Sequence, residues 1–274
     1  MKQKLWGLLF CLCLLPRLAV GETTLFCINV GKADAMLLFV AERIYLIDTG
    51  TKKQGDTVVQ ALSDLSVSHL DGIFITHTDK DHVGGLSKVL ESGVKVNALY
   101  ASVYHDASSM AKHPVKKAAK KYNVPLLWLK AGDVIALPND QRIAVLGPLR
   151  AYPDNNNNQS LVLQVDTADG RILLTGDMEE EAETDLLRAG LLPKVDVLKV
   201  GHHGGKDATQ TKFVLATMPR LAIISTSTAE KPETPNESVV RRLKSAGATV
   251  FVTQEATLGI NVTLKQGEIH YAIQ

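Results

Sequence analysis

Four potential metal ligands lie within six positions of the stretch 76–85, which reads Thr-His-Thr-Asp-Lys-Asp-His-Val-Gly-Gly and follows a short apolar run. Side chains alternate along an extended segment, so we expect His77 and Asp79 on the same side. Asp81 and His82 are adjacent where the chain begins to turn, so they can reach a second point nearby. Imidazole nitrogens and carboxylate oxygens bind divalent metals, and this spacing suits two ions side by side.

Further ligand-type side chains stand directly after other apolar segments. Strand ends suit metal ligands because a rigid sheet holds them in place. A single histidine at such a position is usually a structural residue, whereas several strand ends that carry Asp or His together favour metal binding. Neighbouring glycines permit close approach of the backbone. The candidate positions are Asp48, His77, Asp79, Asp81, His82, Asp177, His202 and His203.

The succession of apolar segments predicts the scaffold. Residues 24–30, 36–40 and 43–47 indicate closely spaced strands, which is typical of hairpins. Residues 56–65 carry apolar side chains at helical spacing. The second half of the chain repeats the succession of strands and helices, and both halves end apolar strands on ligand-type residues. The sequence therefore predicts an α/β fold of two mixed sheets packed face to face with helices outside, as one domain over residues 22–274.

Composition sets few limits on function. The chain has 274 residues, of which 45% are hydrophobic and 22% charged, as in an ordinary globular protein with ample length for a core. The formal net charge of +1 gives no overall attraction to nucleic acid or to an anionic membrane. A helix predicted over residues 110–122 is basic, and its lysines form either a solvated face or a patch that contacts phosphates. These lysines are Lys112, Lys116, Lys117, Lys120 and Lys121.

Residues 1–21 are predicted to be a secretory signal peptide. They combine a short basic start, an apolar run over residues 5–15, and small residues before a cut after Gly21. The apolar run is too short for a membrane anchor and is broken by Pro16 and Arg17. We therefore expect a secreted or periplasmic protein that has no membrane association once the leader is removed.

The chain has three cysteines, and their positions argue against a disulfide framework. Cys11 and Cys13 lie in the predicted leader and would be removed with it. Cys27 would then be alone in the mature protein, so it has no partner for a disulfide within the chain.

The stretch 77–82 resembles the His-x-His-x-Asp-His signature of the metallo-β-lactamase superfamily, with Asp79 where the second histidine usually stands. Within that superfamily the chain is more similar to the hydrolase domain of ComEC-type competence proteins, a DNA-uptake channel family, in a stand-alone and secreted form. The resemblance extends over residues 24–264. Its motifs occur in the same order as in that family, at residues 29–35, 46–50, 76–85, 158–163, 173–177 and 198–204.

This resemblance implies a four-layer αββα sandwich that binds two divalent metal ions. His77 and Asp79 would bind the first ion, and Asp177 would bridge the two ions. The further histidine of the first position has no counterpart in residues 154–158, where Asp154 is the candidate replacement. Asp48 would orient the metal loop through hydrogen bonds to a ligand. The second ion would be bound by Asp81, His82 and His202.

The two departures at the first position bear on the metal. Asp79 replaces a nitrogen ligand with oxygens, and another histidine is missing. Oxygen-rich ligation shifts preference from zinc toward manganese or magnesium. We therefore expect two divalent ions, Mn²⁺ or Zn²⁺, with Mn²⁺ supporting activity at least as well as Zn²⁺.

The resemblance also implies a mechanism of hydrolysis. Two ions about 3.5–4 Å apart hold a bridging hydroxide and stabilise the charge that develops on an attacked phosphoryl or carbonyl group. Asp81 and Asp177 would hold or accept a proton from that water. His203 would protonate the leaving group, bind a phosphate oxygen, or simply form the wall of the site. Lys32, in a predicted turn, is either solvated or in contact with an anionic substrate.

Three functions remain open. The first is a phosphodiesterase or nuclease-like enzyme whose partner is an anionic phosphodiester substrate, with DNA as a candidate. The second is hydrolysis of an ester, lactone or β-lactam by the same metal centre. The third is a metal-containing module that binds nucleic acid or cell-wall polymer without catalysis. Departures from the competence-type pattern at residues 234–235 and 253–255 weaken the assignment to DNA but leave the metal ligands unchanged.

Overall fold

The structure is a computed structural model that describes residues 22–104 and 113–274. The predicted signal peptide and the first part of the basic helix predicted from residue 110, including Lys112, lie outside these ranges. Within them, no helix combines the length and the apolar character needed to cross a membrane.

Two large sheets form the centre of the molecule. The first has eight strands in the order β17-β16-β1-β2-β3-β5-β7-β8, antiparallel from β17 to β3 and parallel from β3 to β8. Its strands are β1 (Thr23–Ile28), β2 (Met36–Val40), β3 (Arg43–Ile47), β5 (Gly72–Ile75), β7 (Leu99–Ser102), β8 (Leu126–Leu129), β16 (Gly259–Lys265) and β17 (Glu268–Ile273).

The second sheet has seven strands in the order β15-β14-β13-β12-β11-β10-β9. It is antiparallel from β9 to β12 and parallel from β12 to β15, so each half of the chain contributes a mixed sheet. Its strands are β9 (Val134–Ala136), β10 (Arg142–Gly147), β11 (Val162–Thr167), β12 (Gly170–Leu174), β13 (Val197–Lys199), β14 (Leu221–Ile224) and β15 (Thr249–Val252). A separate small ribbon pairs β4 (His69–Leu70) with β6 (Lys95–Val96).

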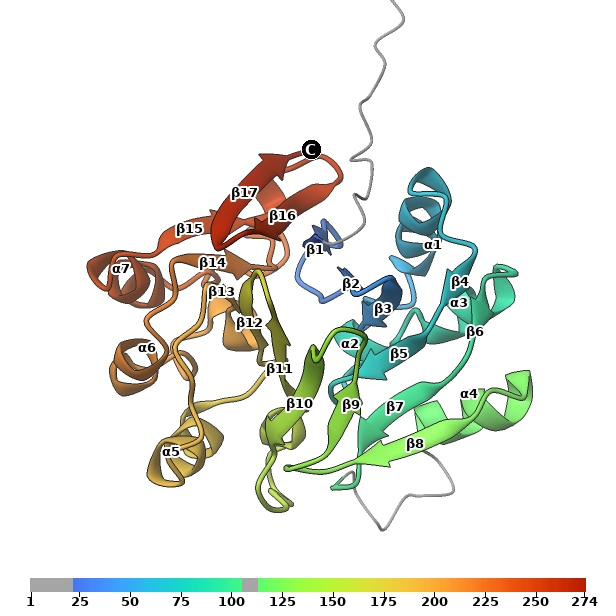
Figure 1. Cartoon of the computed structure of the whole chain (residues 1–274), viewed down its shortest axis with the longest axis horizontal. Helices are drawn as coiled ribbons and strands as arrows, with labels where there is room; N and C mark the ends of the chain where they lie inside the picture. Colours follow the sequence, from blue (N-terminus) through green and yellow to red (C-terminus); the bar gives the residue numbers. More distant parts are fainter. Residues whose placement is uncertain (1–21, 105–112) are drawn as a thin grey trace, which may run out of the picture.

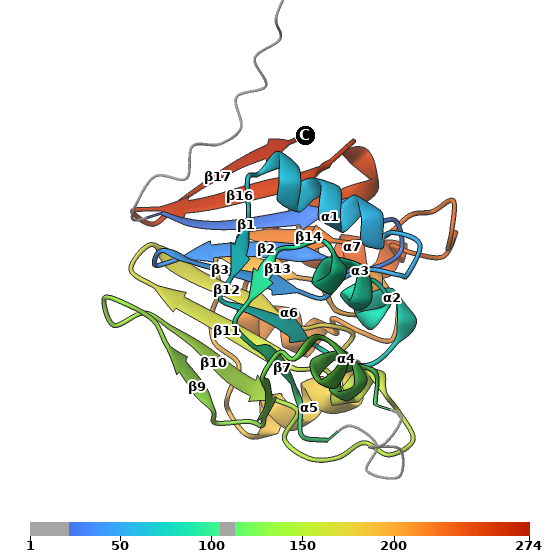
Figure 2. The ribbon, with the colours of Figure 1, turned by 90° about the vertical axis from the view of Figure 1, so that its right-hand side faces the viewer.

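Helices cover the outer faces of both sheets, and the two sheets pack against each other (Figures 1 and 2). The first sheet carries α1 (Gly55–Asp64), α2 (Lys80–Val83), α3 (Leu86–Glu91) and α4 (Pro114–Tyr122). The second carries α5 (Glu180–Arg188), α6 (Thr211–Thr217) and α7 (Glu237–Ser245). Short 3₁₀ turns are η2 (Asn157–Gln159), η3 (Gly201–Gly204) and η4 (Thr253–Glu255). The predicted αββα sandwich is confirmed.

Alternation along the strands explains the layers. In β1, Leu25 and Cys27 point to the core between the two sheets, whereas Phe26 and Ile28 point to the core beneath the helices. Because both faces of the central strands are buried, their sequences are apolar almost throughout. In β5, Phe74 is fully buried between the sheets, with its ring stacked on that of Tyr100 at a centroid distance of 4.5 Å.

The topology brings polar loops from both sheets to one edge. β5 ends at Ile75, and the loop that follows it meets the second sheet through a hydrogen bond of 2.9 Å from the Leu161 amide to the Thr76 carbonyl. On the other side, the loop after β3 packs on Gly85, where a Cβ atom would lie 2.1 Å from the Thr49 carbonyl oxygen. Only glycine therefore fits beside the loop that carries the predicted ligands.

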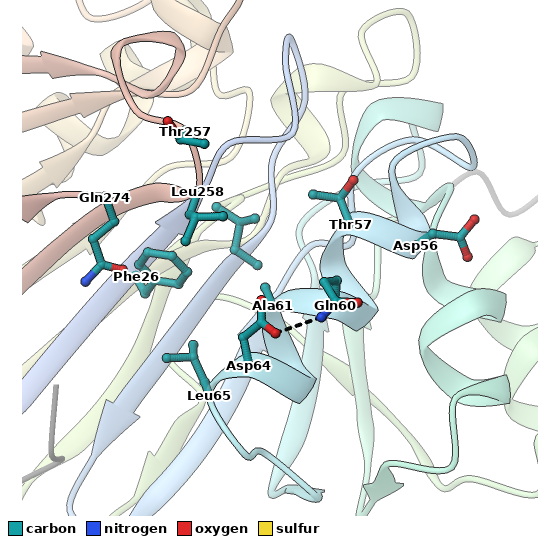
Figure 3. A pocket seen from close by; sticks show the side chains of 11 residues that line it. Phe26, Asp56, Thr57, Gln60, Ala61, Asp64, Leu65, Thr257, Leu258 and Gln274 are labelled. Atoms are coloured by element: carbon teal, nitrogen blue, oxygen red, sulfur yellow. Dashed lines mark hydrogen bonds between the residues drawn. The ribbon is translucent and has the colours of Figure 1, made fainter. Parts of the chain in front are cut away.

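An apolar cavity of about 330 Å³ lies between α1 and the start of the first sheet (Figure 3). Phe26, Ile28 and Leu258 form its apolar wall, and Gln60 at its rim donates a hydrogen bond of 2.7 Å to Asp64. None of its lining residues is a predicted metal ligand, so the cavity is separate from the polar edge described above.

Candidate metal centre

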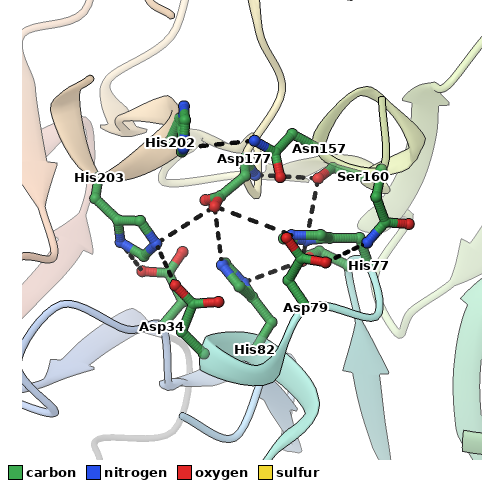
Figure 4. Close-up of polar contacts among 12 residues, drawn as sticks. Asp34, His77, Asp79, His82, Asn157, Ser160, Asp177, His202 and His203 are labelled. Carbon is green, nitrogen blue, oxygen red and sulfur yellow. Dashed lines mark hydrogen bonds and ion pairs between the residues drawn. The ribbon is translucent and has the colours of Figure 1, made fainter. Parts of the chain in front are cut away.

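The loop after β5 directs its first histidine into the protein. His77 is fully buried, and its Nδ1 lies 3.3 Å from the hydroxyl of Ser160, in the loop between η2 and β11. Its Nε2 faces two carboxylates, at 3.7 Å from Asp79 Oδ2 and 3.9 Å from Asp177 Oδ2. Contact with His77 lowers the pKa of the Asp79 carboxyl, and a hydrogen bond from Asn156 lowers it further. His77, Asp79 and Asp177 therefore form one possible metal position (Figure 4).

Asp48 fixes the second histidine of the motif. Its Oδ2 lies 2.8 Å from His82 Nδ1, and both of its oxygens accept hydrogen bonds from Thr76, one from the amide and one from the hydroxyl. Because an ionised carboxylate only accepts, Nδ1 of His82 carries a hydrogen and its Nε2 points to Asp177 Oδ2 at 3.1 Å. The resemblance implied this orienting role for Asp48, and the structure places the residue accordingly.

Asp177 is the carboxylate on which the histidines converge (Figure 4). It follows β12 and is only 2% exposed, with its amide donating to the Ser160 hydroxyl at 3.0 Å. Its Oδ2 lies within 3.9 Å of Nε2 of three histidines, namely His77, His82 and His203. Burial alone would raise the pKa of Asp177, but the positive charges of His203 and His82 bring it well below its usual range.

His203 completes this cluster. Its Nδ1 lies 2.8 Å from the Ser225 carbonyl oxygen, which only accepts, so Nε2 is directed at Asp177 Oδ2 (3.3 Å) and Asp81 Oδ2 (3.5 Å). Burial by itself would lower the pKa of His203, but Asp177 and Asp81 raise it to about 9. Ligand atoms of four residues lie within 4.8 Å of one another and form a second possible metal position: Asp81, His82, Asp177 and His203.

The structure does not bring His202 into this cluster, contrary to the sequence prediction. Its Nδ1 lies 2.9 Å from Asp207 and 3.3 Å from Glu179, and its Nε2 lies 3.4 Å from the side-chain amide of Asn157. His202 and His203 both adopt positive φ, at 43° and 53°, and this tight turn sends their side chains in different directions. The adjacent histidines therefore exchange the positions that were expected of them, His203 lying with Asp177 and His202 outside.

Asp154 is not brought to the first position. Its side chain is exposed, and it belongs to none of the ligand groups within the described residues. The turn that follows it instead places Asn156 there, whose Nδ2 lies 2.5 Å from Asp79 Oδ1. The expectation for Asp154 fails because a loop of five polar residues gives no periodicity from which an inward side chain could be read.

Sequence reasoning assigned no role to a buried ion pair beside the centre. Lys199 and Asp34 are both fully buried, with Nζ 2.8 Å from Oδ2. Lys199 also donates to the Val200 carbonyl at 3.1 Å, while Asp34 Oδ1 lies 3.8 Å from His203 Nδ1. Although burial opposes ionisation, Lys199 and His203 keep the pKa of Asp34 below its usual value. Both residues lie in the family motifs at 29–35 and 198–204, which is the signal that could have pointed to them.

The donor set fits divalent metal ions. Buried polar atoms are almost always hydrogen-bonded, and each exception calls for an explanation. Four buried atoms without a partner in the structure converge here, namely Nε2 of His77, His82 and His203 and Oδ1 of Asp177. Carboxylates also outnumber ammonium groups around the centre. Lys32 and Lys199 pair with Asp81 and Asp34, whereas Asp48, Asp79 and Asp177 contact histidines and have no lysine partner among the described residues. Unpaired imidazole nitrogens beside excess negative charge are the arrangement that metal cations satisfy.

Comparison with known proteins agrees with this geometry. Residues 28–227 match the family model described as the metallo-beta-lactamase superfamily. The chain belongs to this superfamily. Membership and the cluster of unpaired ligand atoms make a metal-dependent hydrolase the enzyme class that fits the chain, and the resemblance drawn from the motifs is confirmed.

Curated relatives within the superfamily carry names from competence and recombination. The chain is 31% identical to ComE operon protein 3 of Bacillus subtilis, over 83% of this chain and 31% of that protein. It is 29% identical to Recombination protein 2 of Haemophilus influenzae, over 79% of this chain and 26% of that protein. It is 26% identical to Competence protein ComA of Neisseria gonorrhoeae, over 82% of this chain and 30% of that protein. The chain thus spans about a third or less of the length of these relatives.

Solved structures share the metallo-β-lactamase fold at low sequence identity. A diphosphatase of the PhnP family aligns with a TM-score of 0.55 at 13% identity, covering 89% of this chain and 97% of that one. The metallo-beta-lactamase fold protein YhfI of Bacillus subtilis aligns with a TM-score of 0.56 at 10% identity, covering 92% of this chain and 100% of that one. The diiron β-hydroxylase CmlA of Streptomyces venezuelae aligns with a TM-score of 0.58 at 10% identity, covering 85% of this chain and 52% of that one. At these identities the likeness concerns the fold alone.

Substitution of Lys199 tests the buried ion pair. Lys199→Met should lower the free energy of unfolding by about 3–5 kcal/mol, because it leaves the buried Asp34 carboxylate without its counter-charge. Urea unfolding followed by circular dichroism would measure the loss. Lys265→Met, which removes an exposed partner of Glu22, is the matched control and should unfold like the wild type. Asp34→Asn combined with Lys199→Met should recover part of the loss, and a Lys199→Met protein as stable as the wild type would refute the argument.

Metal uptake should release protons. In the metal-free protein the pKa of His203 is raised to about 9, so this imidazole is protonated at neutral pH, whereas only its neutral form offers Nε2 as a ligand. Apparent Mn²⁺ affinity should therefore rise from about pH 6 to about pH 9, by about tenfold per pH unit for each proton released. Isothermal titration calorimetry in two buffers of different ionisation enthalpy measures both quantities. An affinity that does not change over this range would contradict the assigned protonation.

Proposed function

We propose that the protein is a dinuclear metal-dependent phosphodiesterase, nuclease-like in its choice of an anionic substrate. One observation carries the proposal. Nε2 atoms of three buried histidines from both halves of the chain converge on Asp177 and have no hydrogen-bond partner among residues 22–104 and 113–274. A site of this kind is costly to fold unless cations occupy it, and paired divalent ions are suited to phosphoryl chemistry.

The side chains divide into two sets around the shared carboxylate of Asp177. His77 and Asp79 would hold one ion with it, and Asp81, His82 and His203 would hold the other. Two divalent ions supply electrophilic stabilisation of phosphoryl charge and an activated water at neutral pH. The site contains three carboxylates, from Asp79, Asp81 and Asp177. It therefore favours Mn²⁺ more than a site built from nitrogen and sulfur ligands would.

The protein's own residues supply orientation and proton handling. Asp48 and the Ser225 carbonyl hold His82 and His203 in the tautomers that present Nε2 to the centre. Asp81 is 21% exposed in its side chain and stands between the buried cluster and solvent, which suits a group that accepts a proton from water. His203 is fully buried, whereas His202 is 24% exposed in its side chain and lines the neighbouring groove, so His202 is the imidazole that a leaving group could reach.

Support for a nucleic-acid substrate comes from the relatives and from surface charge. The relatives' names refer to competence and recombination, and recombination acts on DNA. A groove beside the centre is lined by Lys32, Lys206 and Lys231 as well as by Asp207 and Glu233, and its lysines offer contacts to phosphate groups. The lysines of α4 remain a second candidate contact, although Lys121 is paired with Glu91.

A substrate and metal panel tests the proposal. The full chain loaded with Mn²⁺ or Zn²⁺ would be assayed on single-stranded DNA, a phosphodiester chromogen, a lactone and a β-lactam. We expect turnover of the phosphodiesters, with Mn²⁺ at least as effective as Zn²⁺. Asp81→Asn and His203→Ala should each lower kcat by about a hundredfold or more, since they remove metal-binding atoms. His202→Ala is the matched control and should keep its metal content by atomic absorption.

The other functions correspond to other outcomes of the same panel. Turnover of the lactone or the β-lactam alone would assign the protein to the hydrolysis of carboxylic esters or amides. If neither the wild type nor Asp81→Asn showed turnover, and both bound metal and DNA, the protein would be assigned to the non-catalytic modules. Turnover of phosphodiesters with Zn²⁺ only would contradict the argument from oxygen ligands.

We further propose export from the cytoplasm. A cut after Gly21 would leave the whole of β1 intact, and Glu22 at its start is held by an ion pair with Lys265 at 2.5 Å. The full chain expressed in a bacterial host should therefore be recovered outside the cytoplasm with Glu22 as its first residue, as determined by N-terminal sequencing. Recovery from the cytoplasm with residues 1–21 still attached would contradict it.

A further inference from the structure

The ammonium group of Lys32 lies at the edge of the metal centre. Its Nζ is 2.7 Å from Asp81 Oδ2, and the two side chains are 23% and 21% exposed. The same carboxylate oxygen lies 3.5 Å from His203 Nε2, which has no hydrogen-bond partner. Lys32 and a metal ion at the second position would therefore share one oxygen of Asp81, and Lys32 is not the solvated turn lysine that the sequence allowed.

The turn that carries Lys32 is fixed from two sides. The Asp34 amide donates to the Asp81 carbonyl at 3.1 Å, which ties the turn to α2. The Lys32 amide donates to Glu230 Oε2 at 3.3 Å, on a loop of the second half. Gly31 has φ of +69°, a backbone conformation that side-chain-bearing residues rarely adopt, and the Glu230 carboxylate packs directly against it. The backbone of the turn is thus fixed at the edge of the metal centre, and the ammonium group is held there by its contact with Asp81.

Lys32 also forms part of the wall of an open groove of about 580 Å³. His202 and Lys206 line the same groove, and Lys206 has no ion-pair partner within the described ranges of the chain. Lys231 lies there as well but is paired with Glu233 at 2.7 Å. Lys32 is therefore the one residue of the groove wall that also contacts the carboxylates of the metal cluster, as far as the described residues show.

The positive charge of Lys32 determines its effect on metal binding and on an anionic substrate. An ordinary lysine side chain is a cation at neutral pH, and the ammonium group of Lys32 lies 2.7 Å from Asp81 Oδ2. A cation beside Asp81 repels a metal ion that binds to the same carboxylate. Once metal neutralises Asp81, the ammonium group has less to gain from that contact and can donate to an anionic oxygen in the groove.

We propose that Lys32 is a substrate-positioning residue, whose ammonium group binds a non-bridging oxygen of the phosphodiester in the groove and whose charge weakens metal binding at Asp81. The substrate part rests on the proposed function, because it assumes a phosphoryl group at the centre. The metal part does not, because it concerns only the charge that Lys32 places beside Asp81. A single side chain thereby sets substrate affinity and metal affinity in opposite directions.

Substitution of Lys32 in the full chain tests both parts. Lys32→Met should bind Mn²⁺ at the second position about tenfold more tightly by isothermal titration calorimetry, because a repelling charge is removed. The same variant, loaded with Mn²⁺, should bind inorganic phosphate about tenfold more weakly and show a KM for a phosphodiester chromogen raised by about as much, with a smaller change in kcat. Lys32→Arg should restore both affinities toward the wild type, since it restores the charge.

Lys265→Met is the control for loss of a paired lysine, since its ion pair with Glu22 shares no residue with the metal centre or the groove. It should leave all of these quantities unchanged. Unaltered Mn²⁺ affinity or unaltered phosphate affinity in Lys32→Met would overturn the proposal. If the wild-type protein turned over no phosphodiester, the proposed function would fail, while the binding measurements with Mn²⁺ and phosphate would still decide the role of Lys32.

Discussion

The buried carboxylate of Asp177 is the constraint on which the rest of the structure depends. It is almost fully enclosed and lies within 3.9 Å of three imidazole nitrogens. A charge in such a place is costly unless opposite charge meets it. His77 lies in the loop after β5, His82 in α2 and His203 in the turn after β13, whereas Asp177 follows β12. The site therefore exists only when the ends of both sheets meet. The αββα sandwich is the scaffold that brings these strand ends together.

Buried polar groups around the three histidines determine how their imidazole rings are oriented. Asp48, Ser225 and Ser160 contact the Nδ1 atoms of the three histidines and thereby direct the Nε2 atoms inward. Asp34 adds a buried negative charge behind His203, and Lys199 compensates it. These residues are buried from solvent, and their contacts fix the orientation of the imidazole rings. The family motifs outside 76–85 therefore encode the support for the ligands as much as the ligands themselves.

Fold alone leaves the chemistry of such a centre open. Proteins with this fold include a diphosphatase and a diiron hydroxylase, so the activity must be argued from the side chains around the centre. Here those side chains are rich in oxygen at the first position, where Asp79 replaces nitrogen and Asn156 binds it. Beside them lies a polar groove with Lys32 at its inner end, which provides cationic contact for an anionic substrate.

The sequence by itself determined the layers of the fold, the contribution of one mixed sheet by each half of the chain, and most of the candidate ligands. It could do so because alternation within a strand and adjacency at a strand end are local properties. His77, Asp79, Asp81 and His82 share one short stretch, and Asp48 and Asp177 follow apolar strands, so their direction could be read from the pattern.

Only the tertiary structure decided between His202 and His203, because two successive residues of positive φ reverse the direction of the side chains in a way that no period encodes. It likewise placed Asn156 rather than Asp154 at Asp79, through the packing of a polar loop. The contacts of Lys199 with Asp34 and of Lys32 with Asp81 join residues 165 and 49 positions apart. Such pairs depend on how distant loops meet, which is a property of the packed fold rather than of any local segment.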